Sequence, residues 1–210
     1  MIAIINHELG NFRSVVSAVE YLGEKVLVTN KAEEIKKCKK LIIPGVGNFK
    51  YAMNNLSKFN LIEALNEEVL VKKKSVLGIC LGCQLLLDSS EEGVDLNDKE
   101  KKVKGLGWID GEVKLFTRKK NFPVTHVGWN EVSFSNDKIF HDMPKQVLMY
   151  FNHSYYPKIK NNSDVIGSTN FSMKFSSIFR KKNIYGIQPH PEKSQKFGIN
   201  FLKNFLQNDS

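Results

Sequence analysis

Short apolar runs alternate with amphipathic segments over the first 90 residues of the chain. Apolar side chains recur at helical spacing from Val15 to Leu22, before Gly23, and a longer helical pattern extends from Leu56 to Val71. Continuous apolar strands separated by helices are typical of a parallel sheet that is buried on both faces. The pattern therefore predicts such a sheet, with strands in "IAIIN", "KVLVT", "KLIIP" and "SVLGI".

The pattern changes after about Glu91. The segment "EEGVDLNDKEKKVKGLG" is polar and predicts a surface loop, which also follows the expected helix "LGCQLLLDSS". Short β-type runs come next, at a spacing that indicates antiparallel strands extending the same sheet. These runs are "GEVKLF", "VTHVGW", "QVLMYFNHSYY", "DVIGST" and "SIFRKKNIYGIQP". The chain ends in "QKFGINFLKNFLQ", an amphipathic helix with Phe197, Phe201, Leu202 and Phe205 on one face. We therefore predict one α/β domain over residues 1–210, with a mixed sheet.

Composition narrows the class of protein. The 210 residues contain 41% hydrophobic and 25% charged residues, which is ordinary for a globular protein, and no apolar run is long enough to cross a membrane. The start lacks the features of a signal peptide, and three cysteines do not indicate a disulfide framework, so we expect a cytoplasmic protein. The net charge of +9 comes from scattered lysines beside acids, which favours a solvated surface over nucleic-acid binding or another anionic partner.

The segment "SVLGICLGCQLLL" contains the candidate nucleophile. Gly78 and Gly82 flank Cys80 in a G-x-C-x-G pattern, the cysteine form of the nucleophile elbow between a strand and a helix. This turn would direct the sulfur out of the carboxyl end of the sheet, where open α/β sheets bind ligands. The backbone N–H of Leu81, the next residue, is then a natural donor to an oxyanion.

Three other interpretations of this cysteine remain open from the segment alone. Cys80 and Cys83 form a Cys-x-x-Cys pattern at a strand-to-helix junction, as in thioredoxin-like redox pairs. A zinc site would need two further ligands, and none occurs at a suitable spacing. A buried structural cysteine would not need glycines on both sides.

A base for the cysteine is found in "IYGIQPHPEKSQ". An apolar strand, Ile184–Ile187, leads to His190, and Glu192 follows two residues later. In an extended chain these two side chains point the same way, so Glu192 can orient the imidazole, and Pro191 should keep the segment out of a helix. The loop "PGVG" at 44–47 also ends a strand, and its glycines leave backbone amides free to point at a substrate oxygen.

Together, "PGVG", "GICLGCQLL" and "HPE" resemble the class I glutamine amidotransferases. The resemblance implies a flavodoxin-like three-layer α/β fold, no cofactor or metal, and hydrolysis of L-glutamine through a cysteine thioester. Within this family, "LGNFRSV", "HVGWNEV", "YFNHSYY" and "HPEKSQKFGINFLKNF" look like the glutaminase subunits of imidazole glycerol phosphate synthase. Those subunits pass ammonia to a (β/α)8-barrel partner that makes imidazole glycerol phosphate and an aminoimidazole carboxamide ribonucleotide in histidine biosynthesis.

The resemblance also implies roles for individual residues. Cys80 would be the nucleophile, His190 the acid and base, and Glu192 the residue that orients it. The remaining implied positions are oxyanion donors at Val46, Gly47 and Leu81, glutamine-binding residues at Gln84, Glu92, Ser154 and Tyr155, and a partner contact at Lys193.

The sequence departs from the family pattern in three places. "INHELGN" replaces the more usual Asp-Tyr-Gly-Met-Gly-Asn, Cys83 stands where Met or Val is common, and Pro189 stands where Phe is common. These departures leave the triad intact. The ammonia acceptor stays open, because similar glutaminase and barrel pairs supply ammonia for amidino sugars of surface glycans.

Overall fold

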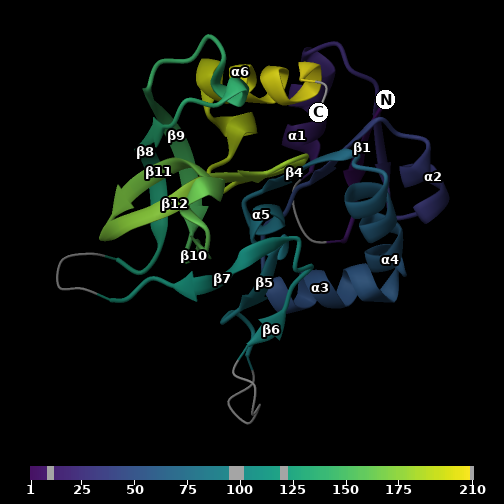
Figure 1. Ribbon diagram of the computed structural model, residues 1–210, viewed down its shortest axis with the longest axis horizontal. Coiled ribbons are helices and arrows are strands. Elements are labelled where there is room, and N and C mark those ends of the chain that lie inside the picture. The colour runs from purple at the N-terminus through teal and green to yellow at the C-terminus, as the bar shows by residue number, and fades with distance from the viewer. Residues whose placement is uncertain (9–11, 95–101, 119–122, 209–210) are drawn as a thin grey trace.

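The computed structural model describes residues 1–8, 12–94, 102–118 and 123–208. Its largest element is a nine-stranded sheet (Figure 1). In spatial order the strands are β2 (Val26–Thr29), β1 (Ile2–Ile5), β3 (Lys40–Ile43), β4 (Ser75–Ile79), β13 (Ile184–Ile187), β12 (Met173–Lys181), β11 (Val165–Phe171), β8 (His126–Phe134) and β9 (Gln146–His153). Neighbouring strands from β2 to β13 are parallel, and those from β13 to β9 are antiparallel. The predicted mixed sheet is therefore confirmed.

Helices cover both faces of the parallel half of this sheet. Along β1, Ile2 and Ile4 pack with α1 (Arg13–Tyr21) and α6 (Gln195–Gln207), whereas Ala3 and Ile5 face the opposite layer. That layer contains α2 (Ala32–Lys36), α3 (Phe49–Lys58), α4 (Leu61–Asn66) and the short α5 (Leu81–Leu85). Strands β1, β3, β4 and β13 are buried on both sides, which explains their continuous apolar sequences. The result is the expected three-layer arrangement (Figure 1).

A second sheet corrects the expectation that all later strands extend the first one. It has four strands in the order β10 (Tyr155–Ile159), β7 (Ile109–Leu115), β5 (Leu87–Ser90) and β6 (Val103–Lys104). The run "QVLMYFNHSYY" is therefore not one strand, because the chain leaves the large sheet at His153 and enters the second sheet at Tyr155. The expected helix "LGCQLLLDSS" is also too long, since "LDSS" forms β5 and pairs with β7. Within the predicted surface loop, residues 95–101 lie outside the described residues.

The helix expected from Leu56 to Val71 is interrupted. Helix α3 ends at Lys58, and α4 begins at Leu61 after Asn60, whose φ of 54° is left-handed. Asparagine tolerates this conformation better than most residues, so it can end one helix and start another. A π-helical turn, Glu67–Val71, follows and buries Glu68, which forms ion pairs of 2.6 Å with both Lys72 and Lys74.

The C-terminal helix has the predicted bounds and is fixed by a contact that the sequence pattern does not reveal. Phe201, Leu202 and Phe205 are buried as expected. Lys40 at the start of β3 is also buried, and its Nζ donates to the carbonyls of Phe205 (2.8 Å) and Leu206 (3.0 Å). A cation at these carbonyls satisfies the unpaired groups at a helix C-terminus.

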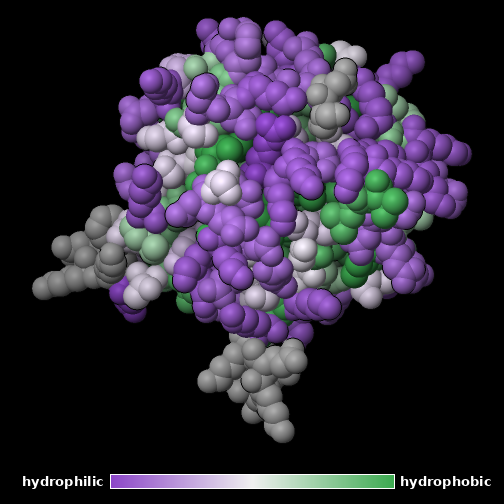
Figure 2. Space-filling model, viewed as in Figure 1, coloured by the Kyte–Doolittle hydropathy of each residue, from purple (hydrophilic) through white to green (hydrophobic). Residues whose placement is uncertain are grey.

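Three 3-10 turns complete the described structure, at Lys138–Phe140, Asn162–Asp164 and Pro191–Lys193. No helix in the described ranges is both long and apolar enough to cross a membrane. Figure 2 shows hydrophilic residues over most of the visible face, broken by small hydrophobic areas.

Candidate active site

Strands β4 and β13 bring the cysteine and histidine together, although 110 residues separate them in the sequence. The two strands are parallel neighbours, with Ile79 opposite Ile187. Cys80 and His190 therefore leave the same edge of the sheet, and the Cys80 N–H donates to the Ile187 carbonyl at 2.9 Å. This edge is the carboxyl end of the parallel strands, where ligands bind in open α/β sheets.

The turn at Cys80 is strained, and it requires its glycines. Cys80 has φ 52° and ψ −113°, a conformation that costs a non-glycine residue free energy. A Cβ at Gly82 would lie 1.7 Å from the Ile43 carbonyl oxygen, and one at Gly78 would lie 2.6 Å from the Gly82 oxygen. The G-x-C-x-G pattern therefore reflects close backbone packing of the elbow against β3. The following helix, α5, has only five residues, so its dipole contributes little at the sulfur.

His190 and Glu192 form a buried pair behind Cys80. His190 Nδ1 is 2.8 Å from Glu192 Oε1, and both side chains are at least 96% buried. Glu192 lies in the Pro191–Lys193 3-10 turn, so the expected extended geometry is wrong although the contact forms. Among the described residues, no hydrogen bond forms at the buried His190 Nε2. Burial lowers the pKa of His190, but the Cys80 sulfur and the Glu192 carboxylate outweigh burial and raise this pKa to about 10.

A cavity of about 280 Å³ opens above Cys80. This volume is near the lower end for ligand pockets and suits a molecule of amino-acid size. Its lining includes every residue that the sequence assigns to the oxyanion or to glutamine, namely Val46, Gly47, Leu81, Gln84, Glu92, Ser154 and Tyr155. Thr125, Asn152 and His153 also line it, and the sequence analysis did not assign them roles.

The candidate oxyanion site is closed in this structure. The Leu81 N–H donates to the Gly45 carbonyl at 3.3 Å, so a backbone oxygen occupies the position where a substrate oxygen would be bound. His7 holds the same loop, because its Nε2 lies 2.7 Å from the Pro44 carbonyl. Val46 is partly exposed and Gly47 has φ 114°. The rest of the unusual segment around His7, residues 9–11, lies outside the described residues and includes the start of "LGNFRSV".

Gln84 and Glu92 present acceptors to the cavity. The two N–H groups of the Gln84 amide donate to the Tyr155 carbonyl and to Gln188 Oε1, both at 2.9 Å, which leaves the Gln84 oxygen for a ligand. Glu92 accepts from the Phe49 N–H at 2.8 Å, and burial raises its pKa even though this hydrogen bond lowers it. Both groups therefore suit a ligand that donates hydrogen bonds, such as an ammonium group.

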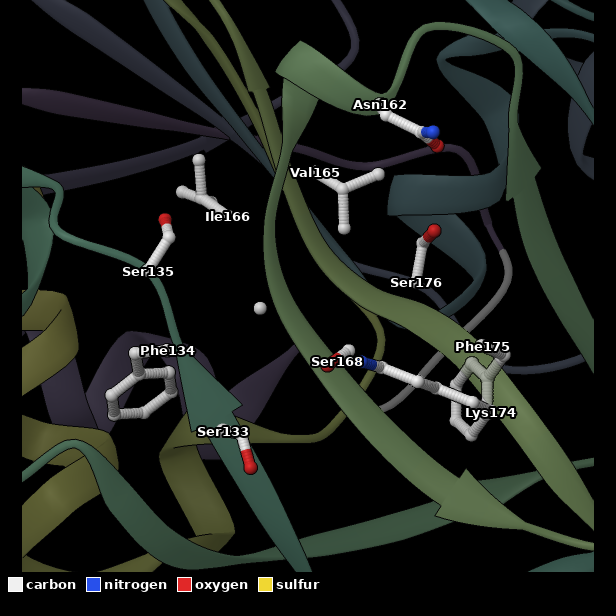
Figure 3. Close-up of a pocket in the computed structure, with 11 residues that line it drawn as sticks. Ser133, Phe134, Ser135, Asn162, Val165, Ile166, Ser168, Lys174, Phe175 and Ser176 are labelled. Carbon is white, nitrogen blue, oxygen red and sulfur yellow. The ribbon is translucent and has the colours of Figure 1, made fainter.

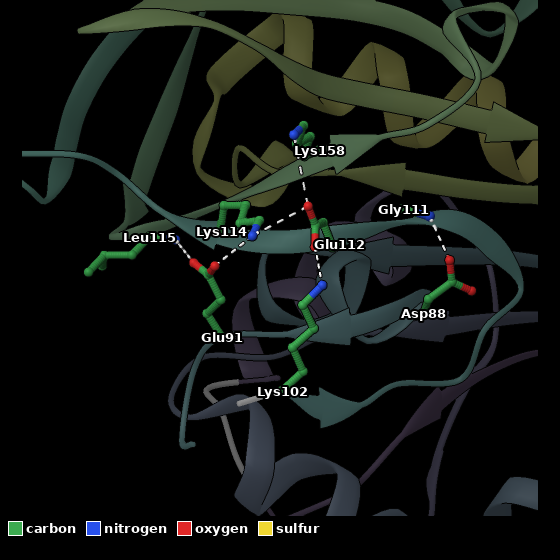
Figure 4. Close-up of polar contacts among 8 residues, drawn as sticks. All are labelled: Asp88, Glu91, Lys102, Gly111, Glu112, Lys114, Leu115 and Lys158. Atoms are coloured by element: carbon green, nitrogen blue, oxygen red, sulfur yellow. Dashed lines mark hydrogen bonds and ion pairs between the residues drawn. The ribbon is translucent and has the colours of Figure 1, made fainter. Parts of the chain in front are cut away.

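A polar network fixes the segment that carries Glu92. The preceding residue, Glu91, accepts from Lys114 Nζ at 2.6 Å and from the Leu115 N–H at 3.2 Å (Figure 4). Lys114 also lies 3.4 Å from Glu112, which pairs with Lys102 at 2.6 Å. These contacts connect strand β7 with the segment that follows β5, and they thereby hold Glu92 over the cavity.

His126 and His153 form a directed hydrogen-bond chain beside the cavity. His153 Nδ1 lies 2.7 Å from the Tyr155 carbonyl and must donate to it, because a carbonyl only accepts. In neutral histidines, His153 Nε2 then accepts from His126 Nδ1 (3.1 Å), and His126 Nε2 accepts from Asn130 (3.0 Å). The His126 ring also stacks on the rings of Phe151 and Phe171. Burial lowers the pKa of His126 to about 4, and burial is also the main cause that lowers the pKa of His153 to about 3.

The histidine chain predicts a loss of stability in acid. Unfolded histidines titrate near 6.5, so below that pH the unfolded state binds protons that the folded state does not. Stability is therefore retained above about pH 6.5 and falls as the pH decreases toward 4, on the order of 1 kcal/mol per pH unit for each histidine. His126→Phe keeps the aromatic stack and removes one titrating group. Thermal unfolding at about pH 7 and pH 5 should show a smaller decrease in Tm for this variant than for the wild type, and equal decreases would contradict the account.

Three residues that the sequence singles out, Lys193, Trp129 and Cys83, do not line the cavity at Cys80. Lys193 is exposed, and its Nζ lies 5.8 Å from the centre of the Tyr150 ring. Trp129 in the segment "HVGWNEV" is 47% exposed, so it is not a buried core residue of its strand. Cys83 is fully buried, and burial raises the pKa of its thiol well above the ordinary value, which disfavours a redox partnership with Cys80. Over the described ranges, no three His, Cys, Asp or Glu side chains gather as metal ligands do.

A larger cavity of about 540 Å³ lies elsewhere, over β8, β11 and β12 (Figure 3). Its lining is mainly serine and apolar side chains, and Lys174 is its only charged member. Its described lining contains no cysteine, histidine or carboxylate, so the chemistry is assigned to the cavity at Cys80.

Comparisons with known proteins agree with this assignment. The sequence model of the family described as "Glutamine amidotransferase class-I" matches residues 3–208. Imidazole glycerol phosphate synthase subunits HisH 2 and HisH 1 of Methanococcus maripaludis are each 40% identical to the chain, with 99% of both chains covered in each case. The glutaminase domain of Trypanosoma brucei CTPS has a similar fold, with a TM-score of 0.66 at 14% identity, covering 100% of this chain and 94% of that one. Because the family model matches almost the whole chain and the relatives are similar over their full length, the chain belongs to the class I glutamine amidotransferases.

Proposed function

We propose that the chain is the glutaminase subunit of an imidazole glycerol phosphate synthase and that it acts in the cytoplasm as one domain. It hydrolyses L-glutamine to glutamate and ammonia, and the ammonia passes to a (β/α)8-barrel subunit. The observation that carries the proposal is the position of Cys80 on a strained elbow, beside a buried His190–Glu192 pair and under a cavity of about 280 Å³. The full-length similarity to HisH subunits supports the choice within the family.

The contacts support a two-step mechanism. The α-ammonium group of glutamine donates to Glu92 and to the free oxygen of Gln84, which places the side-chain amide over Cys80. The Cys80 sulfur forms a bond to the amide carbon, and the C–N bond breaks as His190 transfers a proton to the departing nitrogen. His190 then takes a proton from water, whose oxygen attacks the thioester carbon. The C–S bond breaks, and glutamate and the free cysteine are released.

The closed oxyanion site supports a dependence on the partner. The tetrahedral intermediate needs N–H donors at its negative oxygen, and the Leu81 N–H is already bonded to the Gly45 carbonyl. The 44–47 loop must therefore rearrange before Leu81, with Val46 or Gly47, can stabilise the intermediate. The subunit alone should be a slow glutaminase.

An exposed apolar surface next to the cavity supports the position of the barrel subunit. Val127, Trp129 and Leu148 are 59%, 47% and 55% exposed, and they lie on one face of the β8–β9 pair. Val127 is opposite Asn152, which lines the cavity, so this face reaches the active site. Exposed apolar patches of this kind mark protein interfaces. Lys193, at the edge of the same region, supplies a positive charge for a carboxylate of the partner.

The identity of the ammonia acceptor has a second candidate. One organism contains relatives numbered HisH 1 and HisH 2 at the same identity to this chain, so one cell can hold two such subunits. A paralogous pair could supply ammonia for an amidino sugar instead.

Measuring glutamate release by the purified chain, alone and with candidate barrel subunits, decides between the two acceptors. We expect slow hydrolysis alone and an increase of about 10²-fold or more with a cyclase barrel and its ligand, because an oxyanion donor contributes about this factor. An increase only with a barrel that does not convert the histidine-pathway intermediate would favour the amidino-sugar alternative. No hydrolysis with any barrel would contradict the proposal.

A further inference from the structure

Gln188 makes a direct contact with the candidate nucleophile. It follows β13 immediately, and its backbone N–H donates to the Ser177 carbonyl at 2.8 Å. Its side chain is fully buried, and its Nε2 lies 3.6 Å from Cys80 Sγ, within range of an N–H···S hydrogen bond. Because Gln188 directly follows a strand of the large sheet, its side chain approaches the sulfur from the sheet.

The surrounding contacts fix the orientation of the Gln188 amide. The Tyr155 carbonyl can only accept, so the Gln84 atom facing it at 2.9 Å must be the nitrogen. The second N–H of the same nitrogen points at Gln188, 2.9 Å away, so the Gln188 atom there must be the oxygen. The Gln188 nitrogen is then left facing Cys80.

A second contact agrees with this orientation. Cys83 Sγ lies 3.9 Å from Gln188 Oε1, where a thiol can act as a weak donor to the oxygen. The amide oxygen thus faces two donors, Gln84 and Cys83, and the amide nitrogen faces the reactive sulfur. A flipped amide would place its nitrogen against the Gln84 nitrogen.

We propose that Gln188 is a catalytic residue that donates a hydrogen bond to the Cys80 sulfur and stabilises its thiolate form. A donor to the charged form of a group favours that form, and a thiolate accepts much more strongly than a thiol or a thioester. His190 supplies a positive charge to the sulfur, and Gln188 supplies a neutral donor. The part of the inference that concerns rate rests on the proposed glutaminase function, whereas the sulfur contact does not.

The test is the pH dependence of Cys80 alkylation by iodoacetamide, because only the thiolate reacts. The adduct is assigned to the peptide that contains Cys80. Gln188→Met removes the donor with little change in volume. Gln188→Glu retains the shape and an acceptor for Gln84, and it replaces the N–H that faces sulfur with oxygen. Circular dichroism confirms that each variant is folded, and either variant alone decides the question.

Asn183 provides a matched control. It is a buried amide at the other end of β13, and its Nδ2 donates to the Val69 and Lys74 carbonyls at 2.9 Å, far from the sulfur along the strand. Asn183→Leu should lower the Tm and leave the alkylation profile unchanged. If Gln188 had only a structural role, its variants would behave like Asn183→Leu: the Tm would fall and the alkylation profile of Cys80 would not move.

We expect the alkylation profile to move to higher pH by about one unit in Gln188→Met, and by at least as much in Gln188→Glu. The kcat/KM for glutamine hydrolysis at neutral pH should fall about tenfold. A wild-type alkylation profile in either folded variant would overturn the proposal. If the profile moves but the wild-type protein hydrolyses no glutamine with any barrel, the proposed function fails and the sulfur contact stands.

Discussion

Replacing Cys80 with alanine should abolish glutamine-dependent synthesis by the complex with the barrel subunit. In the proposed mechanism the Cys80 sulfur is the only protein atom that bonds to the substrate carbon, so glutamine hydrolysis should fall by about 10⁴-fold or more. Synthesis from added ammonium salt should continue at the wild-type rate, because the barrel subunit uses ammonia whatever its source. Parallel assays with glutamine and with ammonium salt measure both effects.

Cys83→Ser is the matched control for this variant. Cys83 is buried on the same short helix, three residues from Cys80, and its contact in the site is the 3.9 Å approach to Gln188. The proposed mechanism predicts little change in the glutamine-dependent rate. A loss in Cys83→Ser equal to that in Cys80→Ala would instead support a redox pair and contradict the amidotransferase mechanism.

The second large effect is expected for His190→Asn. Without the imidazole, no group can protonate the departing nitrogen or activate water at the thioester, and the positive partner of the thiolate is lost. General acid and base steps contribute about 10² to 10⁴ each, so kcat should fall by about 10³-fold or more. Glutamine binding should change much less, because in the proposed binding mode it is Glu92 and Gln84 that hold the α-ammonium group. Measuring kcat and KM separately distinguishes the two effects.

His141→Asn controls for the loss of a histidine. His141 is exposed, and it contacts Asp142 rather than the cavity. Its replacement should leave both constants unchanged. A decrease in kcat below about tenfold in His190→Asn would show that another group performs the proton transfers.

Features that depend on local sterics could be predicted from the sequence. The tight turn at Cys80 excludes side chains at Gly78 and Gly82 by contacts within a few residues and with the adjacent strand, so the G-x-C-x-G pattern is visible in the sequence. Strand β4 and helix α6 have their predicted bounds for a similar reason, since each is defined by its own apolar pattern.

Features that depend on distant partners could not be predicted. The segment "LDSS" becomes strand β5 because it pairs with β7, which the local helical pattern does not show. Gln188 appears in the sequence as an ordinary polar residue at a strand end. Its role depends on contacts with Cys80 and Gln84, more than 100 residues away in the chain. The bond from Leu81 to the Gly45 carbonyl is likewise a property of the folded loop.

The most direct test of the central claim, that Cys80 is the nucleophile of a glutaminase, is to trap the covalent intermediate. The wild-type complex is mixed with glutamine, quenched in acid during turnover, and digested, and its peptides are weighed by mass spectrometry. The mechanism predicts one glutamyl group attached through a thioester to the peptide that contains Cys80, and no such adduct in Cys80→Ala. Turnover with no adduct on that peptide in the wild type, or an adduct on the same peptide that persists in Cys80→Ala, would contradict the claim.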